Sequence, residues 1–225
     1  MKNNLSYTEE NYLKAIFSLS KKTDSAVSTN DLAGKLVTNP SSVTDMIRKL
    51  ADKNLVDYKK YQGVTLSKGG KKTAISIIRS HRLWEVFLVK HLSYRWDEVH
   101  EIAEQLEHVK SETLIDHLDA FLEFPTVDPH GDPIPDKDGN MLTFTKKLLS
   151  ELEINQESSI VGVRDSSDDF LKYLNNKGIA IGNSIKVVYK ESFDKSLEVI
   201  LNNNKVLITE EVAKNLFVKD INLKN

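Results

Sequence analysis

The 225-residue sequence contains no cysteine. This absence excludes disulfide-stapled folds, thiolate zinc sites and cysteine nucleophiles. No stretch approaches the roughly 18–20 consecutive apolar residues that cross a bilayer, which excludes an integral membrane protein and predicts no membrane partner. Residues 1–6 lack the apolar segment of a signal peptide. We therefore expect a cytoplasmic protein.

Glycine and proline are also few, at nine and five residues. Four of the five prolines fall within residues 124–135, which predicts a long loop that continues to residue 140. The composition changes at this loop, and we expect the main domain boundary there. Apolar residues make up 40% of the chain, which is enough to form a buried core.

The net charge of −2 conceals an uneven distribution. Residues 1–72 carry 13 basic and 7 acidic side chains, whereas residues 73–140 carry 6 basic and 14 acidic ones. A basic part followed by an acidic part indicates a polyanionic partner for the first and a cationic partner for the second. Accidental clustering of solvated charge is the alternative explanation.

Residues 1–72 have the pattern of a winged helix-turn-helix. Ser28 and Asp31 form a helix-capping pattern, and Asn39-Pro40 predicts the start of the next helix. Two β-type runs, residues 55–59 and 64–66, flank a turn that contains glycine and predict a hairpin. A small helical bundle with a surface hairpin is the alternative.

The helix that starts at Asn39-Pro40 would be the recognition helix. Its apolar residues fall on one stripe, so small polar and basic side chains on the other face can approach base edges and phosphates. Lysines in and after the hairpin would meet the phosphate backbone. The predicted DNA contacts are Asn39, Pro40, Ser41, Ser42, Thr44, Arg48, Lys49, Lys59 and Lys60.

The middle of the chain predicts a helical block. We expect helices over residues 71–91, 96–110 and 111–121, with broad apolar surfaces. A helix-turn-helix head usually reads a two-fold symmetric site and therefore needs a dimer. These helices are the expected homodimer interface.

Histidine and glutamate side chains gather on the polar faces of two of these helices. At about 100° per residue, four of them fall on one face of the helix over residues 96–110, and two lie one turn apart on the preceding helix. They are His100, Glu104, Glu107, His108, His81 and Glu85. Imidazole and carboxylate ligands together suit manganese, iron(II) or zinc. A solvated polar face is the alternative.

The last third of the chain predicts a small β domain. Runs rich in β-branched residues over 159–163, 184–189, 196–201 and 205–209 suggest a barrel of about 65 residues. The fold class is therefore mainly α with small β. The expected domains are a winged helix-turn-helix over residues 1–72, a helical metal-binding and dimerisation domain over 73–140, a linker over 141–157 with a short helix, and the barrel over 158–225.

These motifs, in this order, closely resemble the diphtheria-toxin-repressor family of metal-activated bacterial transcription factors. The manganese-sensing branch with a C-terminal FeoA or SH3-like domain is the nearest match. The resemblance covers essentially the whole chain. It is carried by Tyr12–Ile16, Asn39–Met46, Gly63–Ser67, His81–Glu85, Val99–Glu101, Leu106–His108, Asp128–Gly131 and Pro133–Pro135.

The resemblance implies two metal sites. The primary site corresponds to Glu104, Glu107 and His108, and the second site to His81, Glu85 and His100. In the family a residue of the first helix completes the primary site, and Asn11 holds the matching position, with Glu10 beside it as a second candidate. Metal would thereby bridge the first helix to the helix over residues 96–110 and order the DNA-binding head.

Three further positions bear on the metal. Asp128 lies where manganese-type relatives often have cysteine, and Glu104 lies where iron-sensing relatives tend to have it. Oxygen in place of sulfur favours Mn²⁺ over softer ions, with Fe²⁺ and Zn²⁺ as the alternatives. Asp169, or its neighbour Asp168, matches an acid that the C-terminal domain can lend to the second site.

The resemblance implies a manganese-activated homodimeric repressor that binds a palindromic double-stranded DNA operator of metal-uptake genes. A metal-dependent hydrolase that uses the His/Glu cluster is one alternative. A transcription factor controlled by an organic effector is the other. The sequence has no HExxH or G-x-S-x-G motif, which argues against the zinc-protease and serine-hydrolase classes.

Overall fold

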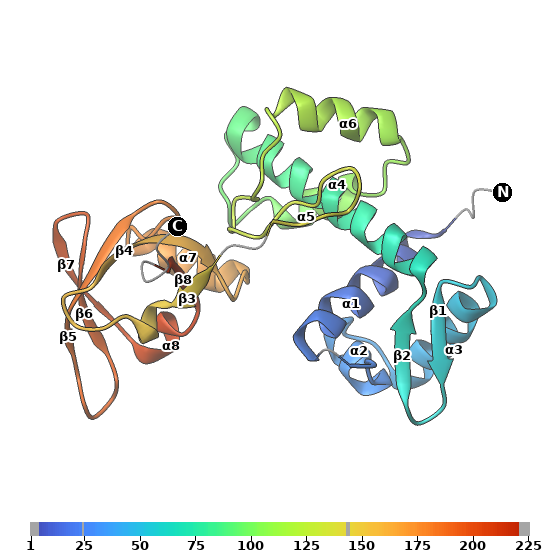
Figure 1. The fold of residues 1–225 in the computed structure, drawn as a ribbon, viewed down its shortest axis with the longest axis horizontal. Coiled ribbons are helices and arrows are strands. Elements are labelled where there is room, and N and C mark those ends of the chain that lie inside the picture. Colours follow the sequence, from blue (N-terminus) through green and yellow to red (C-terminus); the bar gives the residue numbers. More distant parts are fainter. Residues whose placement is uncertain (1–4, 24, 143–144, 221–225) are drawn as a thin grey trace. The chain divides into compact units, whose positions relative to one another are not determined.

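The computed structural model describes residues 5–23, 25–142 and 145–220. The chain forms two compact units. One comprises Met1–His81, Glu104–His117 and Pro135–Asn140, and the other comprises Arg82–Ala103, Leu118–Ile134 and Met141–Asn225. Helix α4, Lys68–Leu92, is continuous and belongs to both units (Figure 1).

The first unit begins with α1 (Tyr7–Thr23), α2 (Thr29–Lys35) and α3 (Pro40–Asp52). Helix α2 contacts both α1 and α3, as Figure 1 shows. The helix starts follow local signals. Ser28 Oγ accepts a hydrogen bond from the Asp31 backbone N–H at 3.1 Å, which confirms the predicted cap, and α3 begins at the predicted proline.

The apolar stripe of α3 is buried as predicted. Val43, Ile47 and Leu50 have no exposed surface, and neither have Leu13 of α1 and Leu32 of α2. Burial of side chains of this size stabilises the fold by roughly 1.5–3 kcal/mol each, so this stripe fixes how α3 lies on the head. The opposite face of α3 remains exposed to solvent.

The predicted hairpin is present as β1 (Val56–Lys59) and β2 (Gly63–Leu66). The two strands are antiparallel, with Val56 opposite Leu66 and Lys59 opposite Gly63. Gly63 has φ +96°, and a Cβ there would lie 2.7 Å from the Val27 carbonyl oxygen. The turn therefore requires glycine at this position.

Helix α4 begins at Lys68, three residues before the predicted start. Ser67 Oγ accepts a hydrogen bond from the Gly70 N–H at 3.0 Å and caps the helix. Gly70 lets the helix pass against the hairpin strand, because a Cβ there would lie 1.9 Å from the Leu55 carbonyl oxygen. Gly69 and Gly70 thus lie within the first turn of α4 rather than in front of it.

Of the next two helices, α5 is shorter than predicted and α6 is close to its predicted length. Helix α5 covers only His100–Leu106 instead of residues 96–110, and α6 covers Glu112–Phe121. Trp96 and Asp97 lie before α5 and hydrogen-bond Asn175, so tertiary contacts hold that segment outside the helix. Among the described residues, no helix combines the length and apolar character needed to cross a membrane.

The C-terminal part is a six-stranded antiparallel sheet in the order β3-β8-β4-β5-β6-β7 (Figure 1). Its elements are β3 (Lys146–Leu148), the 3₁₀ helix η1 (Leu149–Glu151), β4 (Glu157–Val163), α7 (Asp168–Asn176), β5 (Ser184–Lys190), β6 (Leu197–Leu201), β7 (Asn204–Ile208), α8 (Glu210–Ala213) and β8 (Leu216–Lys219). Ile160, Leu174, Ile185 and Val199 lie in one buried core with α7 and η1.

Two local predictions in this part are wrong. The short helix expected in the linker is instead strand β3 followed by η1, and Leu149 and Leu152 are buried in the core of the sheet. No strand was expected after residue 209, but Leu216–Lys219 forms strand β8, which pairs with both β3 and β4. The sheet is not closed among the described residues, because β3 and β7 are its two edges.

Candidate metal centre and nucleic-acid interface

The exposed face of α3 carries the predicted DNA contacts. Asn39, Pro40, Ser41, Ser42, Arg48 and Lys49 are exposed. Thr44 is half-buried, and its hydroxyl donates to the Pro40 carbonyl oxygen at 2.9 Å. Lys49 also pairs with the buried carboxylate of Glu9 on α1, at 3.3 Å. The helix therefore presents small polar and basic side chains to solvent while its apolar stripe is fixed on the head.

The hairpin adds basic charge at its tip. Lys59 and Lys60 are exposed, and Lys60 Nζ lies 4.9 Å from the centre of the Tyr61 ring. Tyr61 is itself 92% exposed, with φ +67° in the turn. An aromatic ring beside lysines at the end of a two-stranded wing suits contact with a phosphate backbone.

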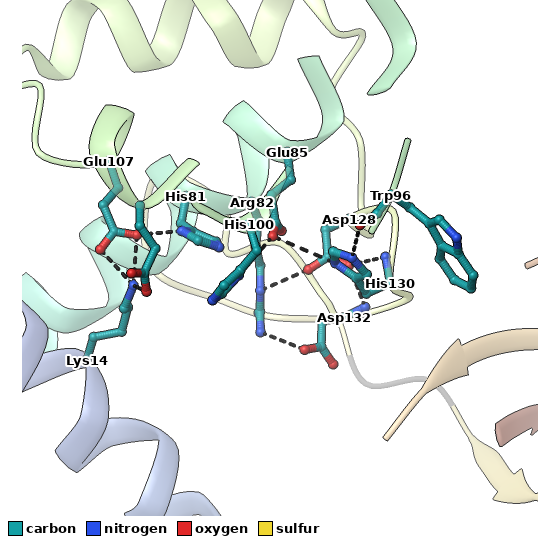
Figure 2. Close-up of polar contacts among 11 residues, drawn as sticks. Lys14, His81, Arg82, Glu85, Trp96, His100, Glu107, Asp128, His130 and Asp132 are labelled. Atoms are coloured by element: carbon teal, nitrogen blue, oxygen red, sulfur yellow. Dashed lines mark hydrogen bonds and ion pairs between the residues drawn. The ribbon is translucent and has the colours of Figure 1, made fainter. Parts of the chain in front are cut away.

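Glu85 of α4 is the centre of the histidine and carboxylate cluster. Its side chain is 3% exposed, and its Oε1 lies 3.5 Å from His100 Nδ1 of α5 and 3.7 Å from His130 Nδ1 (Figure 2). His81 lies one turn before Glu85 on the continuous helix α4. Glu85 and His100 are two of the three residues that match the second family site.

A second group shares Glu85 and consists of Glu85, Asp128 and His130. All three are buried, and their ligand atoms lie within 4.8 Å of one another. Asp128 is held by its own loop: its Oδ1 accepts from the backbone N–H groups of His130 and Asp132, at 2.8 and 3.0 Å. Arg82 approaches its other oxygen at 3.3 Å.

The electrostatics of this group favour a cation. Burial raises the pKa of Asp128 to about 6, and repulsion from Glu85 acts in the same direction. Burial alone would lower the pKa of His130, but its hydrogen bond to Glu85 and the charges of Glu85 and Asp128 raise it to about 9. Glu85 and Asp128 thus both lie near the positive charge of His130, and Asp128 also faces Arg82. Their oxygens and the imidazole nitrogen fit Mn²⁺, Fe²⁺ or Zn²⁺.

The residues that match the primary family site lie elsewhere and have other partners. Lys14 Nζ of α1 lies 2.7 and 2.9 Å from the two carboxylate oxygens of Glu107 and 3.1 Å from Glu104 Oε1. His108 Nδ1 lies 2.5 Å from Glu10 Oε2, and its ring stacks on Tyr7. In the described part of the chain, Glu104, Glu107 and His108 are not among the groups of three or more such residues whose ligand atoms all lie within 4.8 Å of one another.

The other predicted metal ligands are Asn11, Asp168 and Asp169. Asn11 has a buried Oδ1 without a hydrogen-bond partner among the described residues. Asp168 and Asp169 lie exposed in the first turn of α7. Residues other than Asp168 and Asp169 connect the C-terminal part to the histidine and carboxylate cluster around Glu85. The Val163 N–H donates to the His130 carbonyl oxygen at 3.0 Å, and Asn175 bonds Trp96 and Asp97.

Three family models match successive parts of the chain. Residues 4–64 match the iron dependent repressor N-terminal DNA binding domain, and residues 67–136 match the iron dependent repressor metal binding and dimerisation domain. Residues 147–220 match the FeoA domain. Together they cover helices α1 to α3 with the hairpin, the histidine and carboxylate cluster around Glu85, and the C-terminal sheet.

Individual relatives agree with these matches. An HTH-type transcriptional regulator of Methanocaldococcus jannaschii is 34% identical over 119 residues, which is 53% of this chain and 95% of the relative. The iron-dependent repressor IdeR of Mycobacterium leprae is 32% identical over 133 residues, 59% of this chain and 57% of IdeR. A solved manganese-dependent transcriptional repressor in complex with manganese has 34% identity and a TM-score of 0.83, over 95% of this chain and 100% of that one.

The chain belongs to the diphtheria-toxin-repressor family of metal-dependent transcription regulators. Membership makes it a DNA-binding, metal-dependent transcriptional repressor, and the hydrolase alternative is wrong. The FeoA match also confirms that the C-terminal sheet is the expected third part of a manganese-type family member.

Sequence reasoning did not assign one residue of the group around Glu85. His130 follows Asp128 in the Asp-Pro-His-Gly segment, which carried the resemblance, yet only Asp128 was assigned as a ligand. The available signal was a histidine two residues after an acid, in the loop that holds four of the five prolines. The contacts of Lys14 with Glu104 and Glu107 were not predicted either, because the spacing of residues on one helix does not show which charged side chain of another helix lies against it.

Proposed function

We propose that this chain is a cytoplasmic, manganese-activated homodimeric repressor of metal-uptake genes that binds a palindromic double-stranded DNA operator. The observation that carries the metal assignment is the buried group of Glu85, Asp128 and His130, whose ligand atoms lie within 4.8 Å of one another. The oxygens of two buried carboxylates lie beside one imidazole nitrogen, which is a donor set that can bind a divalent cation. The exposed basic face of α3 supports the DNA partner.

Manganese is preferred because of the donor set. Asp128 and Glu85 supply hard oxygen and His130 supplies nitrogen, a combination that suits Mn²⁺ and, as alternatives, Fe²⁺ and Zn²⁺. The solved relatives include a manganese-dependent repressor with manganese and the repressor ScaR with zinc, at 34% and 31% identity. The absence of cysteine removes the thiolate that would favour softer ions.

Glu85, Asp128 and His130 would hold the ion, and His81 and His100 are the further candidate ligands. A bound divalent ion supplies the positive charge that offsets repulsion between the two buried carboxylates. The chain's own residues fix the geometry: Asp128 orients the backbone of His130, and Arg82 holds the loop through Asp128, Asp132 and the Pro133 carbonyl oxygen. This support would keep the ligands in one arrangement.

We further propose the domain limits 1–72, 73–140, 141–157 and 158–225, with the last domain an SH3-like barrel. The helical domain would form the dimer. Phe121 of α6 is 59% exposed and Leu92 at the end of α4 is 52% exposed, and His91 packs on Phe121 with ring centres 4.8 Å apart. Apolar and aromatic surface exposed in this way suits burial against a second copy.

Operator binding with and without manganese tests the proposal. An operator is first selected from a random double-stranded DNA library with the full chain and Mn²⁺. We expect binding to require Mn²⁺, to be lost on chelation, and to fall at least tenfold in Glu85→Gln. Glu101→Gln, an exposed glutamate of α5, is the matched control and should bind as the wild type does. Equal binding under chelation would contradict the proposal.

A further inference from the structure

Lys14 lies where the family resemblance expects a metal ion. Its ammonium group is within 3.1 Å of three carboxylate oxygens: both of Glu107, which Figure 2 shows beside Lys14, and one of Glu104. A divalent ion bound by the same carboxylates would lie roughly 2.0–2.6 Å from their oxygens. An ammonium group and a metal ion therefore cannot occupy this position together.

The Glu107 carboxylate is already compensated by protein groups. Its side chain has no exposed surface, and a carboxylate in that position is costly unless paired and hydrogen-bonded. Lys14 covers both of its oxygens, and His81 Nδ1 lies 2.5 Å from Oε2. The buried charge thus has an ammonium and an imidazole as partners before any ion is bound.

The contact joins helix α1 of the DNA-binding head to the segment around α5. Lys14 is in the middle of α1, Glu104 is on α5, and Glu107 follows α5 directly. The Glu10–His108 pair, at 2.5 Å, and the stacking of Tyr7 on His108 join the same two segments. This junction is complete with protein side chains alone.

We propose that Lys14 is a built-in cation that replaces a metal ion at the Glu104–Glu107 pair. Glu107 then serves as the carboxylate partner of His81 and not as a metal ligand. A carboxylate that accepts a hydrogen bond from one ring nitrogen of histidine fixes the orientation of the other nitrogen. Metal binding in this chain is thereby confined to the residues around Glu85, and Lys14 ties α1 to Glu107 whether or not metal is present.

A titration of the full chain with Mn²⁺ tests this inference. Electron paramagnetic resonance of the free ion gives the number of ions bound per chain. Lys14→Met keeps the aliphatic stem and removes the charge, and we expect it to bind one more Mn²⁺ per chain than the wild type. Lys14→Arg keeps the charge and should gain none. Glu104→Gln in the wild type should leave the number of bound ions and their affinity unchanged within twofold. In the Lys14→Met chain it should weaken the added site at least tenfold.

Two outcomes would overturn the inference: a Lys14→Met chain that binds no extra ion, or a Glu104→Gln chain that loses one. If Lys14→Met does not fold, the ion counts of Lys14→Arg and Glu104→Gln decide alone. The inference deepens the proposed function, and Glu85→Gln separates the two. A wild type that binds no ion at all would contradict the proposed function. The inference about Lys14 can still be tested in that case, by asking whether Lys14→Met adds an ion to the Glu85→Gln chain.

Discussion

Gly131 and Gly162 lie backbone against backbone. A Cβ on Gly131 would be 2.5 Å from the Gly162 Cα and 2.1 Å from the Val161 carbonyl oxygen, and Gly131 has φ +84°. The next hydrogen bond, from the Val163 N–H to the His130 carbonyl oxygen at 3.0 Å, extends this contact. Strand β4 of the C-terminal sheet is thus fastened to the loop that carries Asp128 and His130.

Gly131→Ala should therefore damage both stability and metal binding. The positive φ alone costs about 1–3 kcal/mol for a residue with a Cβ, and the overlap with Val161 adds to it. We expect unfolding to become easier by more than about 3 kcal/mol, and Mn²⁺ affinity to fall at least tenfold because His130 moves. Urea unfolding and metal titration measure the two effects.

Gly178→Ala is the matched control for that change. Gly178 also has a positive φ, +68°, but a Cβ there would meet nothing within 4 Å. It should lose only about 1 kcal/mol and keep its Mn²⁺ affinity. If Gly131→Ala and Gly178→Ala lose equal stability and neither changes metal binding, the contact between β4 and the loop does not support the cluster.

Local signals predicted the head of the molecule well. The Ser28 cap, the Pro40 helix start and the hairpin turn at Gly63 each depend on a few neighbouring residues, so the sequence contains what decides them. Helix α5 and strand β8 were mispredicted because distant partners decide them. Asn175 holds the segment before α5, and β3 and β4 pair with Leu216–Lys219.

The metal cluster was predictable to a similar extent. Helical spacing predicted polar faces that carry His81, Glu85 and His100, and α4 and α5 are indeed helices. His130 was not assigned because it lies in a loop without a period. The contact of Lys14 with Glu104 and Glu107 depends on how α1 packs against α5 and the segment after it. The spacing of residues within one helix carries no information about this packing.

Glu9 makes stability depend on pH. Burial alone would raise its pKa, but hydrogen bonds from Lys53, the Ser6 backbone and Lys49 lower it from 4.5 to about 2. The folded chain therefore holds the charged form more strongly than the unfolded chain does. This stabilisation, about 3 kcal/mol, is complete above pH 4.5 and is lost as the pH falls towards 2.

The variant Glu9→Gln tests this. At pH 7 it should be less stable than the wild type by up to about 3 kcal/mol, and the difference should shrink as the pH falls from 4.5 to 2. Asp52→Asn, an exposed acid on α3, is the control and should show little difference at any pH. Urea unfolding at several pH values measures it. A Glu9→Gln difference that does not change with pH would contradict the assignment.

Arg48 of α3 should contribute to DNA binding alone. It is exposed and pairs at 3.5 Å with Asp45, three residues before it. Arg48→Ala should weaken operator binding by about 1–3 kcal/mol and leave Mn²⁺ affinity unchanged. Fluorescence anisotropy on labelled operator and a parallel metal titration measure both. Lys172→Ala, an exposed lysine of α7, controls for the loss of one positive charge, and an equal loss in the two variants would remove Arg48 from the contacts.

Asp128 should decide which metal is preferred. Its side chain is 3% exposed and belongs to the Glu85 group, where its oxygen is a hard ligand. Asp128→Cys places a softer thiolate at the same position, which favours Zn²⁺ over Mn²⁺. We expect the ratio of Zn²⁺ to Mn²⁺ affinity, from competition titrations, to rise at least tenfold.

Asp132→Cys separates this effect from the mere addition of a thiol. Asp132 is 49% exposed, is also paired with Arg82, and lies outside the Glu85 group. Its variant should keep the wild-type affinity ratio within twofold. Asp128 also holds the His130 backbone, so Asp128→Cys will lose some affinity for every metal. The ratio is therefore the informative quantity: if both affinities fall and the ratio stays constant, Asp128 acts by orienting His130 and does not bond the ion.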